Sequence, residues 1–183
     1  MTKLSKVIIV LLLWIPSNSF AEDKLIDDFT SQPGARWQFI ADTVMGGVSN
    51  GEVQFLREGS DTYARMTGTV STENKGGFIQ VRTAMSPRIP KNARGIRLIV
   101  RGNNQRYFIH LRTSGTILPW QYYQAAFEVS REWSEVRLPF VDFRPSGIFL
   151  RKLPMPENIK SLGIVAFGRD HIVEIDALEV SFY

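Results

Sequence analysis

Histidine and cysteine set narrow limits on the chemistry available to this chain of 183 residues. It has no cysteine and two histidines, His110 and His171, which excludes thiol nucleophiles, thiolate zinc sites and multi-histidine metal sites within one chain. A histidine acts as a general base only when another group positions it. An enzyme using His110 with a carboxylate across a sheet is therefore the weakest functional hypothesis, and we expect a protein that is not an enzyme.

Carboxylates are more numerous, but their spacing does not define an acid and base pair. The candidates for such chemistry are Asp27, Asp28, Asp42 and Glu128. Two acids near the start of the sequence and two near its end could instead offer oxygens to a structural calcium ion, which the sequence leaves open. These are Asp27, Asp28, Asp176 and Glu179. We assign no catalytic residue, no cofactor and no metal ligand.

Alternating segments place cationic and aromatic side chains on one face of a predicted sheet, because successive side chains of a strand point to opposite faces. In the segment 107–113 the odd positions face a core, which leaves Phe108, His110 and Arg112 opposite. If the strands concerned are neighbours, the ligand-binding or partner-binding candidates on this face are Arg82, Arg101, His110, Arg112 and Tyr122. A solvated face with no ligand is the alternative, since antiparallel sheets commonly leave one face in water.

Two diglycine loops form the second group of candidate residues. Glycine is used where the backbone needs a positive φ or a close approach. The candidates are Asp42, Gly46, Gly47 and Ser49 in the first loop and Asn74, Gly76 and Gly77 in the second. In a structural interpretation the Asp, Ser and Asn side chains satisfy loop amides. In a functional interpretation the loops form a rim at one end of a sandwich that grips a carbohydrate or a peptide.

Trp120 follows Pro119 in an irregular segment, and it is the tryptophan that we expect to be exposed. A flat aromatic face offers apolar area for a sugar ring and loses little entropy on binding. An exposed indole in a concavity favours a carbohydrate ligand, whereas a broader apolar patch favours a protein partner. Trp120 is therefore the residue that best separates these two hypotheses.

The elements that position these residues are predicted to be β-strands, because short alternating segments are separated by Gly, Pro, Asn and Ser. The clearest strands are Tyr63–Val70, Gly77–Thr83, Gly95–Arg101, Tyr107–Thr113, Tyr123–Val129, Trp133–Pro139, Ser161–Phe167 and Ala177–Phe182. Asn103–Asn104 and Ser130–Glu132 are predicted to be hairpin turns between adjacent strands. Eight or nine strands predict an all-β sandwich.

The first 21 residues are predicted to be a signal peptide, and residues 22–183 a single domain. Lys3 and Lys6 precede the apolar run Val7–Ile15, and small residues surround a cleavage position after Ala21. The run is far shorter than the roughly 20 residues that span a membrane as a helix. Removal of residues 1–21 takes away two lysines and no acid, so the formal net charge falls from +4 to +2. We expect an exported, periplasmic or secreted protein that does not bind nucleic acid.

Several of these segments occur in a familiar order. They are Asp27-Asp28-Phe29, Trp37, the run Asp42–Ser49 and the run Asn74–Phe78. Together they resemble the complex I intermediate-associated protein 30 family, over about Leu25 to Phe182. The resemblance implies a galactose-binding-like jelly-roll β-sandwich. It also implies a protein partner, because eukaryotic relatives act as assembly factors for respiratory complex I.

The first functional hypothesis is therefore a non-catalytic binding module. It would bind a protein partner in the manner of a chaperone or assembly factor, through the loop rim and the arginine-bearing face. A respiratory-complex subunit is the partner that the resemblance implies. The alternative is a carbohydrate-binding module.

Overall fold

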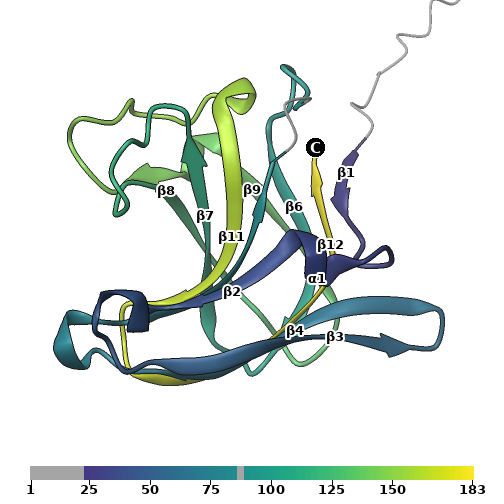
Figure 1. Cartoon of the computed structure of the whole chain (residues 1–183). Coiled ribbons are helices and arrows are strands. Elements are labelled where there is room, and N and C mark those ends of the chain that lie inside the picture. The colour runs from purple at the N-terminus through teal and green to yellow at the C-terminus, as the bar shows by residue number, and fades with distance from the viewer. Residues whose placement is uncertain (1–22, 86–88) are drawn as a thin grey trace, which may run out of the picture.

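The computed structural model describes residues 23–85 and 89–183 (Figure 1). The predicted signal peptide and its cleavage position lie outside these residues. The strands are β1 (Lys24–Asp27), β2 (Trp37–Ala41), β3 (Asn50–Glu58), β4 (Asp61–Val70), β5 (Phe78–Ala84), β6 (Gly95–Gly102), β7 (Arg106–Thr113), β8 (Tyr123–Glu128), β9 (Ser134–Pro139), β10 (Arg144–Pro145), β11 (Ile159–Phe167) and β12 (His171–Phe182). The short helices are α1 (Pro33–Arg36) and four single 3-10 turns at Asp42–Met45, Glu73–Lys75, Phe140–Asp142 and Pro156–Asn158.

The strands form two antiparallel sheets that pack face to face as a jelly-roll sandwich (Figure 1). The first sheet has the order β3-β4-β12-β6-β9, with β1 beside β12, and the second has the order β10-β8-β7-β11-β5-β2. The predicted all-β sandwich is confirmed. Within the described part of the chain, no helix is long and apolar enough to cross a membrane.

Strand alternation correctly separates the core from the outer faces. Ile96, Leu98 and Val100 of β6 and the odd positions of β7 are buried between the sheets. Trp37 fills one end of this core, where its ring packs 5.3 Å from that of Phe29. Burial of such large apolar side chains provides the main free energy of folding.

The two predicted hairpin turns are wrong, because each connects strands of different sheets. Asn103–Asn104 lead from β6 in the first sheet to β7 in the second, and Ser130–Glu132 lead from β8 back to β9. The two crossings lie side by side, since the Gly102 amide donates to the Ser130 carbonyl at 2.6 Å. Strands facing each other across a sandwich and strands paired in one sheet show the same apolar alternation, so the pattern alone does not distinguish them.

This topology corrects the placement of Arg101, which lies on the outer face of the first sheet, away from Arg82 and Arg112. Its guanidinium donates to the buried carboxylate of Asp176 at 2.9 Å and to Glu58 at 2.7 Å. It also lies 4.3 Å from the ring centre of Trp133. Such charge-assisted bonds and cation–π contacts fix the side chain in place. Arg101 is therefore a packing and ion-pairing residue of the first sheet.

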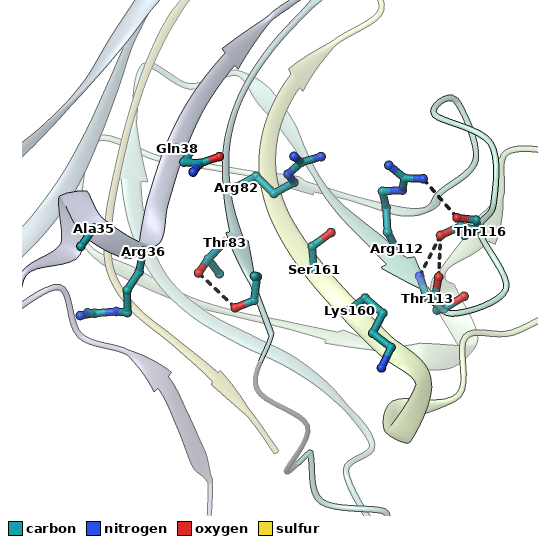
Figure 2. A pocket seen from close by; sticks show the side chains of 11 residues that line it. Ala35, Arg36, Gln38, Arg82, Thr83, Arg112, Thr113, Thr116, Lys160 and Ser161 are labelled. Atoms are coloured by element: carbon teal, nitrogen blue, oxygen red, sulfur yellow. Dashed lines mark hydrogen bonds between the residues drawn. The ribbon is translucent and has the colours of Figure 1, made fainter.

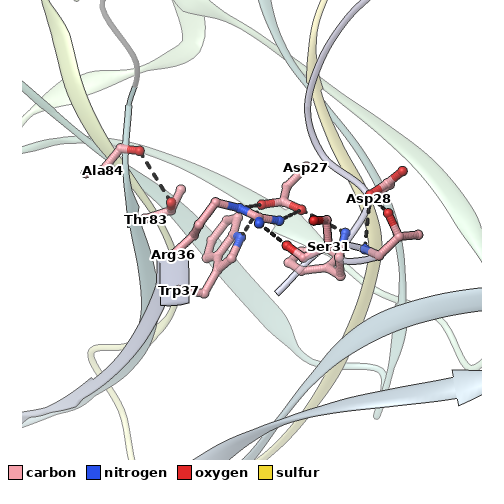
Figure 3. A network of polar contacts seen from close by, with 9 residues as sticks. Asp27, Asp28, Ser31, Arg36, Trp37, Thr83 and Ala84 are labelled. Carbon is pink, nitrogen blue, oxygen red and sulfur yellow. Dashed lines mark hydrogen bonds and ion pairs between the residues drawn. The ribbon is translucent and has the colours of Figure 1, made fainter. Parts of the chain in front are cut away.

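A second buried carboxylate, Asp27, fastens the start of the domain to the sandwich (Figure 3). It accepts hydrogen bonds from Arg36 at 2.7 and 2.9 Å, from the indole of Trp37 at 2.9 Å and from the Phe29 amide at 2.8 Å. Burial raises the pKa of Asp27, but these hydrogen bonds outweigh it, so that pKa lies below its usual value. The motif formed by Asp27, Phe29 and Trp37 is thus a structural joint.

Most of the acids that could offer oxygens to a calcium ion are bound by arginines. Asp27 is occupied by Arg36, Asp176 by Arg65 and Arg101, and Glu179 by Arg97. Within the residues that the structure describes, no group of three or more His, Asp or Glu side chains is arranged to hold a metal ion. Arginines thus bind three of the four acids, and the fourth, Asp28, accepts hydrogen bonds from Thr30.

Candidate functional site

The first diglycine loop and the second are joined by the buried carboxylate of Asp42. This carboxylate accepts the amide of Ser49 at 3.0 Å and its hydroxyl at 2.5 Å, and the amides of Gly77 at 2.5 Å and Phe78 at 3.2 Å. Burial raises the pKa of Asp42, but the hydrogen bonds from Gly77 and Ser49 outweigh it, so that pKa lies below its usual value. Asp42 and Ser49 are fully enclosed and have no surface to offer a ligand.

At two positions only glycine fits, because the Asp42 carboxyl group lies against the backbone there. A Cβ at Gly47 would lie 2.3 Å from the Asp42 carboxyl group, and one at Gly76 would lie 2.4 Å from it. Gly46 and Gly77 instead have φ values of 89° and 128°, which side chains rarely adopt. Asn74 is exposed, and it is another residue with a positive φ. The two loops therefore fit the structural interpretation, in which polar side chains satisfy loop amides and the glycines allow the tight turns.

The outer face of the second sheet carries a hollow of about 660 Å³ (Figure 2). It opens over β2, β5, β11 and β7, next to the loop that follows β7. Its lining includes the polar residues Arg36, Gln38, Arg82, Arg112, Lys160 and Ser161. Its volume is in the range of small-molecule binding sites.

Strand register explains how this hollow is built. β11 lies between β5 and β7, so Gly163 separates Arg82 on one side from His110 on the other. Arg112 pairs with Ser161 on the same face. Figure 2 shows the two arginines on either side of β11, with the short Ser161 side chain between them. The small residues of β11 leave the space, and the long side chains of its neighbours border it.

No acidic side chain of the described chain lines the hollow. Arg112 is held in place by the carbonyl groups of Thr116 and Leu118, each 3.1 Å from Nη2. Burial lowers the pKa of Arg82, and the nearby positive charge of Arg112 lowers it further. Arg36 is the exception among the cations, because it pairs with Asp27. The hollow is therefore a positively charged, hydrogen-bonding surface.

An aromatic cluster adjoins the hollow on the same face. The rings of His110 and Tyr122 are stacked, 4.0 Å apart and 9° from parallel. Phe167 meets the His110 ring edge-on at 5.6 Å, and Phe108 packs against Phe167 at 6.0 Å. Tyr122 is half-buried, and its partner His110 lies across Gly163 from Arg82. Alternation thus correctly placed Arg82, His110, Arg112 and Tyr122 on one face.

His110 has the environment of a packing residue. Burial lowers the pKa of its imidazole to about 4, although the amide of Gln124 beside it opposes the shift. Among the described residues it makes no hydrogen bond or ion pair with a carboxylate, and its Nε2 atom has no partner. General base catalysis needs a positioned partner group. The geometry therefore gives no support to His110 as a catalytic base.

Trp120 is exposed, as predicted, but it lies outside the hollow. Its side chain is 65% accessible in the loop between β7 and β8. This loop is bonded to the segment after β10, since the Ser146 hydroxyl donates to the Trp120 carbonyl at 3.0 Å. Both segments carry further exposed apolar side chains, namely Ile117, Leu118, Ile148 and Phe149. We call Trp120 and these four residues the apolar loops.

The sequence interpretation missed several residues of the hollow. Gln38 lies on β2, whose five residues Trp37–Ala41 were not predicted as a strand, although Trp37, Phe39 and Ala41 alternate with it. Lys160 and Ser161 begin a strand that was predicted, and their alternation with Leu162 could have assigned Ser161 to this face. Arg36 could not have been found in this way, because it lies on a helix.

The fold and this face define the class of protein as a jelly-roll β-sandwich with one polar, hollowed outer face. Solved structures with the same fold include the family 11 carbohydrate-binding module of the Clostridium thermocellum cellulase Lic26A-Cel5E, with a TM-score of 0.68 and 13% identity over 90% of this chain and 95% of that one. A complex of the family 11 module from C. thermocellum with a β-1,3-1,4-mixed-linked tetrasaccharide has a TM-score of 0.66 and 13% identity, over 87% and 94%. An exo-β-agarase matches with a TM-score of 0.55 and 3% identity, over 90% of this chain and 25% of that one. At these identities the likeness concerns the fold.

A family model assigns the chain more specifically. The model described as Complex I intermediate-associated protein 30 matches residues 27–174, so the chain belongs to that family. The resemblance inferred from the motifs is confirmed. No curated protein is similar enough in sequence to match the chain.

Proposed function

We propose that the protein is a non-catalytic binding module that acts after export and binds a carbohydrate chain on the outer face of its second sheet. The observation that carries this proposal is the hollow between Arg82 and Arg112. On the same face the ring of Tyr122 stacks on His110, which lies across Gly163 from Arg82. Guanidinium, amide and hydroxyl groups next to an aromatic ring are the groups that bind sugar hydroxyls and stack on sugar rings.

The fold supports the proposal, because solved carbohydrate-binding modules share it. The family 11 module named above was solved with a mixed-linked tetrasaccharide. The two diglycine loops give less support to a gripping rim, since Asp42 is enclosed and its hydrogen-bonding capacity is used within the fold.

The test is a substitution that fills the hollow. Ser161→Phe places a large ring between Arg82 and Arg112, and it should abolish binding of any glycan that a glycan array identifies for the wild type. Thr69→Phe is the matched control, because Thr69 is exposed on β4 of the other sheet. Calorimetric titrations of both variants should give wild-type affinity for the control alone. Equal affinities for the wild type and both variants would show that the glycan binds at another surface.

A protein partner is the second candidate, and the apolar loops favour it. Ile148 and Phe149 are each 90% accessible, and the loop that carries Trp120 and Ile117 lies against their segment. Exposed apolar side chains grouped in this way are typical of protein interfaces.

This candidate is tested by capture from the cell envelope with two forms of the mature chain. A protein retained by the wild type and lost with the double variant Ile148→Ser and Phe149→Ser would support it. These side chains are exposed, so the variant should keep the wild-type melting temperature. Retention by both forms would show that the apolar loops are not the interface.

A further inference from the structure

Arg82 and Arg112 on the second sheet have different surroundings from the arginines of the first sheet. On the first sheet each arginine of the central strands is paired, as Arg65 is with Asp176 and Arg97 is with Glu135, both at 2.7 Å. On the second sheet, Arg82 and Arg112 make no ion pair with any described residue, and no acid lines the hollow between them. The arginines of the central strands of the first sheet are therefore neutralised, whereas Arg82 and Arg112 keep their charge. On the second sheet Arg106 is paired, with Glu128 at 3.1 Å.

One of the two unpaired charges is held in position by the loop after β7, and the other is partly buried. Arg112 is fixed by two loop carbonyl groups, those of Thr116 and Leu118. Arg82 is half-buried beside β11, where both burial and the charge of Arg112 lower its pKa. Keeping two like charges close together and partly removed from water is unfavourable unless an anion lies between them. Lys160, exposed at the edge of the hollow, adds a third positive charge.

We propose that the hollow binds an acidic polysaccharide, with a carboxylate or sulfate group of one sugar unit held between the guanidinium groups of Arg82 and Arg112. This inference rests on the proposed carbohydrate function. Arginine suits the role because its planar fork donates two parallel hydrogen bonds to such a group. A sugar chain fits better than an acidic peptide, because Gln38, Ser161 and the threonines of the lining add hydroxyl-binding groups next to the arginines.

The experiment is a set of calorimetric titrations of the mature chain with matched ligands. Oligogalacturonate is compared with its methyl ester, which removes the charge and keeps the sugar chain, and a sulfated galactan oligosaccharide tests the other anion. We expect the charged forms to bind at least about tenfold more tightly than the methyl ester, because hydrogen bonds to charged groups are the stronger ones. We also expect the affinity to fall as salt is raised.

Arg82→Gln is the main variant, since Arg82 makes no hydrogen bond to another described residue and its loss should leave the fold intact. It should weaken binding of the acidic ligand by about 10- to 100-fold and weaken binding of the methyl ester much less, because only the acidic ligand loses a charge-assisted contact. Arg57→Gln is the control, because Arg57 is an exposed arginine on β3 of the other sheet. Arg112→Lys keeps the charge and loses the fork, so it should weaken binding of the acidic ligand as well.

The outcomes separate this inference from the function on which it rests. Equal affinity for the charged and esterified chains, blocked by Ser161→Phe, would overturn the inference and keep the carbohydrate function. No binding of any glycan would overturn both. Equally tight binding of polyglutamate of the same charge would show that the hollow recognises charge alone, and would overturn the choice of a polysaccharide. Preference for the uronate or for the sulfated galactan would establish which anion is recognised.

Discussion

Replacing Asp42 with Asn tests whether the two diglycine loops depend on one buried charge. The change keeps the size of the side chain, removes its charge and turns one acceptor oxygen into a donor NH₂ group. In the best orientation the remaining oxygen keeps the three donors that now bind Oδ2, namely the Ser49 hydroxyl and the amides of Gly77 and Phe78. The NH₂ group then faces the Ser49 amide, which donates to Oδ1 in the wild type.

The expected loss follows from this count. One hydrogen bond to a charged acceptor is lost, worth about 1.5–3 kcal/mol, and the three others become weaker bonds to a neutral oxygen. We therefore expect Asp42→Asn to lower the free energy of unfolding by roughly 2–4 kcal/mol. For a domain of this size that corresponds to a fall of roughly 4–16 °C in melting temperature.

The assay is urea unfolding of the mature chain, followed by tryptophan fluorescence, because the buried ring of Trp37 reports on the core. Asp170→Asn is the control. Asp170 also accepts hydrogen bonds from a loop amide and hydroxyl, those of Thr72, but it is exposed, so this variant should lose much less stability.

The pKa of Asp42 lies below its usual value, so its charge stabilises the fold above about pH 4 and this contribution is lost as the pH falls. The wild type and Asp42→Asn should therefore converge in acid. Equal urea midpoints at pH 7 would refute the reasoning.

Three further predictions follow from the same structure. Gly47→Ala and Gly76→Ala should each cost about 1–3 kcal/mol of stability in urea unfolding, because the new Cβ meets the fixed Asp42 carboxyl group, whereas Gly46→Asn should cost less, since Gly46 faces open space and asparagine tolerates its positive φ. An NMR titration of the imidazole signals should give His110 a pKa of about 4, with no change between pH 5.5 and 8, and a value near 6.5 would contradict its burial. Intact mass of the protein recovered from the cell envelope should correspond to a chain that begins at Glu22, and a chain that begins at Met1 would refute the predicted signal peptide.

Alternation along single strands was sufficient to predict much of the binding face. Each strand of the sandwich has one side in the core, so the apolar positions of β7 place His110 and Arg112 on the other side without further information. The same reasoning placed Arg82 on the outer side of β5. These assignments depend on contacts that every strand makes with the core, and they are local in the sequence.

The pairing of strands could not be predicted in this way. Arg101 follows the same local rule as Arg112, but its strand belongs to the other sheet and its guanidinium binds Asp176, 75 positions away in the sequence. Likewise, the role of Asp42 depends on Gly77, 35 positions later, and the diglycine motif alone did not separate a structural loop from a binding rim. Contacts between distant segments decide both cases.

The central claim is that the outer face of the second sheet is the binding surface, and NMR mapping of the ¹⁵N-labelled mature chain tests it most directly. On addition of oligogalacturonate, the account predicts that amide signals of Arg82, Arg112 and Gly163 shift, together with the side-chain signals of Tyr122. Shifts confined to the apolar loops around Trp120 and Phe149, with the signals of β5, β7 and β11 unchanged, would contradict it.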